Sequence, residues 1–429
     1  MQAARWKIVL GGVGLLLWSL SAAPAQNLSP LGDVPDYHRL DAYQETITRE
    51  EFVRALGTLY APHGGWEALI RADAEAVVIR KTSVPLDDLY TLRFAADDAH
   101  RRPLPAAFWR PRAALPPTPP PADKPLAGVR IAIDPGHLGG RWARMEERYF
   151  RLGDTAPVME GEMTLQVARR LAERLRGLGA ERVDLVRDRT EPTTPLRPSD
   201  LVEQARFLLS ERGVRSPPRL YDGPLDPNRP NAVLWNAENL FTRADIRARA
   251  ARVNDTLRPD LVVCLHFNAE KWGDPAAPEL VPRNHLHLLV NGCYEPEEIA
   301  RDDVRFEMLL RLLERTGPEE LAAAEPVAAA LATATGLPPY QYTGANAVHV
   351  GGSPFVWARN LLANRLDGCP VVYCEPYVMN SPEVFARVQA GDYEGTRDFG
   401  GVQRKSLVRE YADAVAEGLA EYYRARPAR

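Results

Sequence analysis

Three short apolar stretches of the sequence each end on a side chain that can bind a metal ion or accept a proton. The stretches are residues 129–134, 260–265 and 370–374. The first leads through a Pro-Gly turn to His137, the second to His266 and the third to Glu375. In open α/β sheets, functional groups gather outside the carboxyl ends of parallel strands, so these side chains could converge. A catalytic zinc typically takes three protein ligands from histidine and carboxylate, which His137, an acidic residue near position 160 and His266 would supply.

Each of these patterns is a weak signal on its own. Asp-Pro-Gly-His is a turn after a strand, and a lone histidine is more often structural than a ligand; Glu375 alone could merely cap a neighbouring loop. His285 and His287 lie two residues apart, which places them on one face of a strand. We interpret that pair as structural or substrate-contacting, and His349 as a loop residue near the cleft, rather than as further ligands.

The pattern of residues 26–100 predicts a small α+β domain in the N-terminal part of the chain. Thr48 and Glu51 have the spacing of a capping box, which predicts a helix that continues to about Tyr60. Strands are expected at 76–80 and 90–94. Residues 101–125 are so rich in proline that a polyproline II spacer and a domain boundary are expected there.

From residue 126 to 429 the pattern predicts a second, larger domain of the α/β class. An amphipathic helix follows Glu160, and the strands that flank it form a strand, helix, strand unit over 129–186. The predicted fold is a mostly parallel open sheet with helices on both faces. Further elements are expected as an Arg-rich helix at 242–257, strands at 287–290, 355–358 and 371–374, and helices at 304–313, 318–335 and 406–425.

Composition and the N-terminus bear on location and partners. The 429 residues carry a net charge of -4, which gives no electrostatic reason to expect nucleic acid or an anionic membrane as partner. Residues 1–25 combine a basic start, an apolar run and a small-residue exit, which predicts a cleaved export signal and a mature chain in the periplasm or outside the cell. An uncleaved anchor is the alternative, but the apolar run is shorter than the ~20 residues that span a bilayer. The four cysteines are expected to be buried thiols.

Taken in order, the motifs resemble those of the zinc-dependent N-acetylmuramoyl-L-alanine amidases, over most of residues 127–425. The motifs are Ile-Asp-Pro-Gly-His-Leu-Gly-Gly at 133–140, Glu160 before its helix, His-Phe-Asn-Ala at 266–269 and Val-Tyr-Cys-Glu at 372–375. The resemblance implies a cell-wall hydrolase that acts on peptidoglycan. It implies that zinc is bound by His137, Glu160 and His266 and that Glu375 is catalytic. The family's acidic ligand lies five residues before the first core leucine of its helix, which here is Leu165, so the resemblance selects Glu160 over Glu162. The residues implied to contact these groups or the substrate are Asp134, Glu162, Asn268 and Arg359.

The sequence departs from the family pattern in its first metal loop. Leu138 separates His137 from the glycine pair, no acidic residue follows that pair directly, and the step from His137 to Glu160 is long, at 23 residues (160 minus 137). Residues 190–239 form a proline-rich insertion, read as either a lid or an inert surface loop, whose apolar residues include Leu234 and Trp235.

Two other functions stay open at this point. One is a zinc peptidase or deacylase acting on a related amide, and the other is a non-catalytic peptidoglycan-binding module. The sequence names no regulatory partner.

Overall fold

The computed structural model describes residues 26–82, 88–116, 119–214, 232–271, 273 and 277–426. The expected export signal lies outside the described residues, and so do residues 215–231 of the expected insertion. No helix among the described residues is long and apolar enough to cross a membrane.

The larger part of the chain is organised around a seven-stranded mixed sheet. Its strands, in spatial order, are β10 (Val348–His349), β11 (Val356–Ala358), β9 (Leu286–Val290), β12 (Val371–Pro376), β8 (Leu261–Leu265), β4 (Arg130–Pro135) and β7 (Arg182–Leu185). Strands β12, β8, β4 and β7 are parallel, whereas β9 pairs antiparallel with β12 and parallel with β11. The predicted open, mostly parallel sheet is therefore confirmed, with a reversal of direction at β9.

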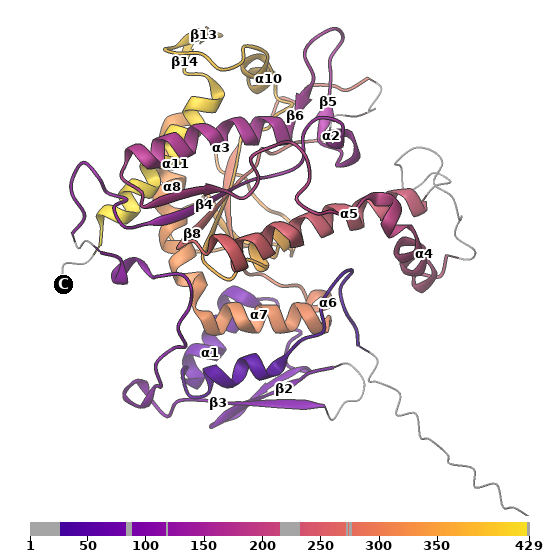
Figure 1. Cartoon of the computed structure of the whole chain (residues 1–429), viewed down its shortest axis with the longest axis vertical. Helices are drawn as coiled ribbons and strands as arrows, with labels where there is room; N and C mark the ends of the chain where they lie inside the picture. Colours follow the sequence, from indigo (N-terminus) through magenta and orange to yellow (C-terminus); the bar gives the residue numbers. More distant parts are fainter. Residues whose placement is uncertain are drawn as a thin grey trace, which may run out of the picture.

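Helices cover both faces of this sheet, as predicted, because alternate residues of its strands are buried on opposite sides. Ile131 and Val263 belong to the core under α3 (Glu160–Gly177), α8 (Thr316–Thr335) and α11 (Leu407–Arg424). Ala132 and Val262 belong to the opposite core, which includes the π-helical turn η6 (Arg252–Leu257) at the end of α5 (Ala232–Ala251). Figure 1 shows α3 and α5 on opposite sides of β4 and β8. All four cysteines are buried free thiols, as expected.

Helix α3 forms because its apolar residues recur every three or four positions. Met163, Val167, Leu171 and Leu175 are buried against the sheet, and acidic side chains occupy the first turn while basic ones occupy the last. At its first turn a Cβ on Gly161 would lie 2.3 Å from the Leu138 carbonyl carbon. A glycine is therefore needed for the helix to begin against the loop that carries His137.

The N-terminal unit contains the predicted helix, as α1 (Arg49–Ala55) and the π-helical turn η2 (Leu56–Tyr60), and the two predicted strands, β2 (Ala76–Arg80) and β3 (Leu89–Arg93). A third strand, β1 (Ile70–Ala72), was not predicted. The Thr48 side chain caps α1 by accepting a hydrogen bond from the Glu51 N–H (3.3 Å), as predicted. The Glu51 side chain does not complete the box, because it pairs with Arg101 and with Arg315 instead.

The core of this N-terminal unit is completed by α7 (Asp302–Glu314). Phe52 and Leu92 share one apolar cluster with Phe306 and Leu309 of that helix. Figure 1 shows α7 beside α1, β2 and β3. The N-terminal unit therefore packs directly on the larger part of the chain.

The described part of the proline-rich segment 101–125 also packs on the larger part, rather than standing apart as a spacer. Trp109 is buried in the core of one sheet face and Leu115 in the core of the other. Arg110 donates to both carboxylate oxygens of Asp260, at 3.0 and 2.7 Å. Proline fixes an extended backbone here, but apolar and charged side chains between the prolines bind the segment to the sheet.

The insertion contains more helix than its proline content suggested. The expected helix near 201–209 is observed as α4 (Val202–Glu211). The described part of helix α5 already includes Ala232, ten residues before the expected start at 242 (242 minus 232), so Leu234 and Trp235 are helical rather than loop residues. The reason is packing: Val233 and Ala237 are buried against Ala205 of α4.

The remaining elements are short or peripheral. They are η1 (Tyr37–Tyr43), η3 (Asp98–His100), η4 (Arg112–Ala114), α2 (Trp142–Met145), β5 (Tyr149–Phe150), β6 (Val158–Met159), η5 (Pro198–Leu201), α6 (Pro296–Ile299), α9 (Leu362–Arg365), α10 (Pro382–Gln389), β13 (Arg397–Phe399) and β14 (Val402–Arg404). Three of them matter below, because α2 and the hairpin formed by β5 and β6 fill the long step between His137 and Glu160.

Candidate metal centre

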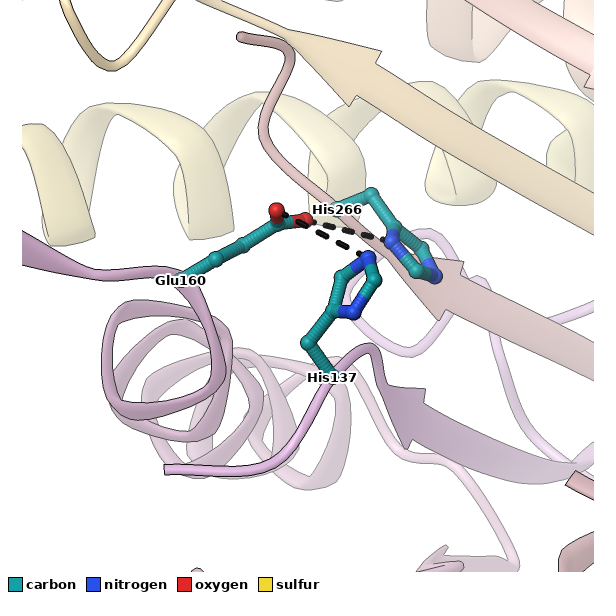
Figure 2. Close-up of side chains that lie close together, drawn as sticks. All are labelled: His137, Glu160 and His266. Carbon is teal, nitrogen blue, oxygen red and sulfur yellow. Dashed lines mark hydrogen bonds and ion pairs between the residues drawn. The ribbon is translucent and has the colours of Figure 1, made fainter. Parts of the chain in front are cut away.

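His137, Glu160 and His266 converge at the carboxyl end of the sheet. One ligand atom from each lies within 4.8 Å of the others, and no further group of this kind occurs among the described residues. Glu160 Oε1 is 3.2 Å from His266 Nδ1, and Glu160 Oε2 is 3.7 Å from His137 Nε2. Figure 2 shows the two imidazoles turned toward the single carboxylate. Glu162 is not part of this group.

Adjacent strands bring the two histidines together. His266 directly follows β8, and His137 follows its neighbour β4 by two residues, separated from it by Gly136. A Cβ on Gly136 would lie 2.1 Å from the His266 ring. The glycine of the Pro-Gly turn is thus required by the close approach of the second histidine.

His137 has a left-handed backbone, with φ of 55°, which is uncommon for a residue with a side chain. The Arg187 guanidinium holds this turn by donating hydrogen bonds to the carbonyl oxygens of His137 and Pro135. Asp134, at the end of β4, forms a buried ion pair with Arg249, at 2.7 Å. Asp134 therefore acts on the loop through arginine and does not contact the histidines.

Glu146 orients His137, and the sequence analysis missed it. Its Oε2 lies 3.2 Å from His137 Nδ1 and accepts a hydrogen bond from the Leu138 N–H at 2.6 Å, with only 4% of the side chain exposed. Burial raises the pKa of the Glu146 carboxyl, but the hydrogen bond and charge of His137 outweigh it and lower the pKa below its ordinary value. The absent acidic residue after the glycine pair is replaced by one just after α2.

We expect Glu146→Gln to weaken zinc binding by about 10- to 100-fold, the usual effect of losing the carboxylate that orients a metal-binding histidine. One carboxylate oxygen of Glu146 faces both His137 Nδ1 and the Leu138 N–H. An amide N–H group in its place would be turned toward these donors and would no longer hold the His137 ring. Competition with a chromophoric chelator measures the affinity. Glu147→Gln, at the exposed neighbouring position, is the matched control. Equal affinities in the two variants would show that Glu146 does not orient the ligand.

Glu160 is buried, at 1% side-chain exposure, and is held as an anion. Its Oε1 accepts a hydrogen bond from the Phe267 N–H at 3.0 Å, and Arg148 Nε lies 3.1 Å from its Oε2. Burial raises the pKa of Glu160, but the charges of His137, His266 and Arg148 lower it by more than burial raises it. The pKa of Glu160 therefore lies below its ordinary value. Arg148 comes from the β5–β6 region, where its carbonyl also accepts from the Glu160 N–H.

Glu375 lies on β12, the strand beside β8. Cys374 pairs with Leu265, so the next residues along the two chains, Glu375 and His266, are neighbours. The side chain is 20% exposed, and its Oε2 is 3.0 Å from His287 Nε2. Burial raises the pKa of Glu375, but the hydrogen bond with His287 and nearby positive charges lower it to about 2.

The other predicted site residues lie around this centre without joining it. Glu162 Oε1 accepts a hydrogen bond from the Gly140 N–H at 3.2 Å, which holds the glycine pair after His137. Asn268 Oδ1 accepts from the neighbouring Ala269 N–H. Arg359 NH1 lies 3.4 Å from the Tyr342 hydroxyl, on the side of the site where Glu375 stands.

The donor set fits a zinc ion. Two imidazoles and one carboxylate match the three protein ligands of a catalytic zinc, with a fourth position left for water or substrate. Glu160 Oε2 is buried and already faces positive charge, with Arg148 Nε at 3.1 Å and His137 Nε2 at 3.7 Å, so a bound cation would share this oxygen with the Arg148 guanidinium. The carboxylate of Glu146 behind His137 completes the usual pattern of a metal-binding histidine with a hydrogen-bonded second nitrogen.

Comparison with known proteins gives matches among solved structures only. No family model matches the chain, and no curated protein matches it. The solved structures it resembles include the N-acetylmuramyl-L-alanine amidase Ami1 from Mycobacterium smegmatis, with 18% identity and a TM-score of 0.36, covering 70% of this chain and 98% of that one. AmiC2 of Nostoc punctiforme has 14% identity and a TM-score of 0.33, covering 68% and 96%.

A third solved structure is the CwlD amidase of Clostridioides difficile, in complex with the GerS lipoprotein. It has 12% identity and a TM-score of 0.35, covering 68% of this chain and 98% of that one. TM-scores this low carry no functional argument, so the function is argued from the geometry of the site alone.

Proposed function

We propose that this chain is an exported, zinc-dependent N-acetylmuramoyl-L-alanine amidase, which hydrolyses the amide bond between N-acetylmuramic acid and L-alanine in peptidoglycan. The observation that carries the proposal is the convergence of His137 and His266, which follow the adjacent strands β4 and β8, with Glu160 of α3. Glu375 of the next strand, β12, lies beside them. The motifs that deliver these four residues are those of the amidase family, in the same order along the chain.

The side chains support hydrolysis of an amide without a covalent intermediate. His137, Glu160 and His266 would hold zinc, which when bound supplies a Lewis acid that polarises the amide carbonyl and lowers the pKa of water. Glu375 then accepts the proton of the attacking water and transfers it to the departing amine. The lowered pKa of Glu375 keeps this carboxylate ionised at neutral pH, so its oxygens are acceptors and not donors.

We further propose that the mature protein works in the periplasm or outside the cell, with peptidoglycan as its partner and no nucleic acid. The basic, apolar and small-residue pattern of residues 1–25 supports export. The substrate would have to meet the centre from the side of the strand ends, where Glu375 and Arg359 are partly exposed.

The test is to incubate purified mature protein and zinc with isolated sacculi and identify the new chain ends by mass spectrometry. Free lactyl ends on muramic acid, together with new L-alanine amino termini, support the amidase. New ends within the peptide would instead show a peptidase, and binding without release would show a non-catalytic module. The control is the same protein after treatment with a chelator, which should release nothing until zinc is restored.

A further inference from the structure

His287 is a buried histidine on β9, and it lies beside the proposed base, Glu375, on the neighbouring strand β12. Strand β9 runs antiparallel to β12, and its register sets His287 directly opposite Glu375. The His287 side chain is 2% exposed, and its Nε2 lies 3.0 Å from Glu375 Oε2. Because the register of two central strands fixes both backbones, this contact does not depend on a mobile loop.

Aromatic side chains enclose the other sides of His287. The Tyr342 hydroxyl is 3.0 Å from the same Nε2, and the Tyr340 ring centroid is 5.0 Å from that of His287. His285, one residue before β9, faces Tyr340 as well, and its Nε2 lies 3.5 Å from Glu270. His287 Nδ1 is buried and makes no hydrogen bond to any described residue.

These contacts define which nitrogen of His287 carries a proton. Glu375 is ionised and can only accept, so the hydrogen between the two groups belongs to His287 Nε2. Nδ1 lies on the other side of the ring and has no hydrogen-bond partner among the described residues. The Tyr342 hydroxyl oxygen lies within hydrogen-bond distance of both His287 Nε2 and Arg359, so it can accept a hydrogen bond from either group.

We propose that His287 is a positioning residue for the amide hydrolysis: its Nε2–H holds Oε2 of Glu375 and leaves Oε1 as the oxygen that exchanges a proton with water and with the departing amine. This inference rests on the proposed function. A partly exposed carboxylate without such a tether would sample other rotamers, whereas general base catalysis requires the accepting oxygen to stay within hydrogen-bond reach of the water.

The tether also sets the direction of a pH effect. The groups that face His287 are Glu375, His285, Tyr340 and Tyr342, with Arg359 next to Tyr342. A hydrogen bond donated to an ionised carboxylate stabilises the anion and lowers its pKa, so removing the donor raises that pKa. The acidic limb of kcat/KM should then move to higher pH.

The experiment compares His287→Phe, which keeps an aromatic ring but has no donor, with His287→Gln, whose amide N–H group can reach the same carboxylate. In the zinc-loaded protein, His287→Phe should lower kcat by about 10- to 100-fold, the effect of one charge-assisted hydrogen bond, while KM and zinc content stay near normal. Its acidic limb should shift upward. His287→Gln should recover kcat to within several-fold of the wild type.

His349→Phe is the matched control, because His349 is exposed, lies on edge strand β10 and uses its Nε2 for a hydrogen bond with the Ser353 carbonyl. It should leave kcat and the pH profile unchanged. Equal losses in His287→Phe and His287→Gln would overturn the proposal, because they would point to packing rather than to a donor. Wild-type kcat and an unshifted pH profile in His287→Phe would overturn it as well.

A second readout separates this inference from the proposed function. If the wild type releases no lactyl ends, the amidase assignment fails, yet the tether can still be measured. Infrared titration of protein labelled with ¹³C-glutamate, with the Glu375→Gln spectrum subtracted, follows the Glu375 carboxylate without turnover. An upward shift of its pKa in His287→Phe supports the tether, and an unchanged pKa overturns it.

Discussion

Glu375→Gln is expected to retain zinc and the native fold while turnover of sacculi falls by about 10² to 10⁴, the usual contribution of a general base. The amide keeps the shape of the carboxylate but cannot accept the proton of the attacking water. Zinc is retained because the three ligands come from β4, α3 and β8, whereas Glu375 comes from β12. The measurements are metal content by mass spectrometry and the initial rate of lactyl-end release.

The control for that variant is Glu421→Gln, an identical change on an exposed position of α11. It should leave both zinc and turnover unchanged. Near-normal turnover in Glu375→Gln would mean that the base lies elsewhere, with Glu162 the next candidate by sequence. In the structure Glu162 is committed to the Gly140 N–H, so that outcome would require the loop after His137 to rearrange.

Local pattern was sufficient to predict the sheet and the group of residues that could bind a metal. The apolar runs before His137, His266 and Glu375 are strands, and they are adjacent because parallel strands joined by helices pack side by side. The period of buried residues in α3 likewise predicted its core face, with Glu160 at its first turn. These features depend on residues close together in sequence.

The features that sequence did not predict depend on contacts between distant segments. Glu146 lies beside His137 only because α2 folds back over the loop, and no spacing rule connects the two residues. The helical conformation of residues 232–241 depends on the packing of Val233 against α4, and the N-terminal core depends on α7. His287 was interpreted as structural or substrate-contacting, and only the antiparallel register of β9 places it opposite Glu375.

Metal binding by the three converging side chains stays a prediction, and His266 offers the sharpest test of it. Its ring stacks on Tyr373 at 4.3 Å between centroids and crosses the His137 ring at 84°. The ring is thus fixed by packing in the orientation that presents Nδ1 to Glu160. A ligand held this rigidly contributes affinity because little freedom is lost when the metal binds.

His266→Ala should therefore reduce zinc from about one ion per chain to a small fraction. Losing a group that only hydrogen-bonds a ligand costs up to about 100-fold in metal affinity, so losing the ligand itself should cost more, and turnover should fall with the affinity.

The His266→Ala change also removes a buried ring. His137→Ala, at a site with 21% side-chain exposure, therefore serves as a second ligand variant whose fold is less affected. His349→Ala is the control. Metal content after dialysis and the thermal midpoint of each variant distinguish ligand loss from misfolding. A folded His266→Ala protein that kept full zinc and full activity would place the metal centre elsewhere in the chain.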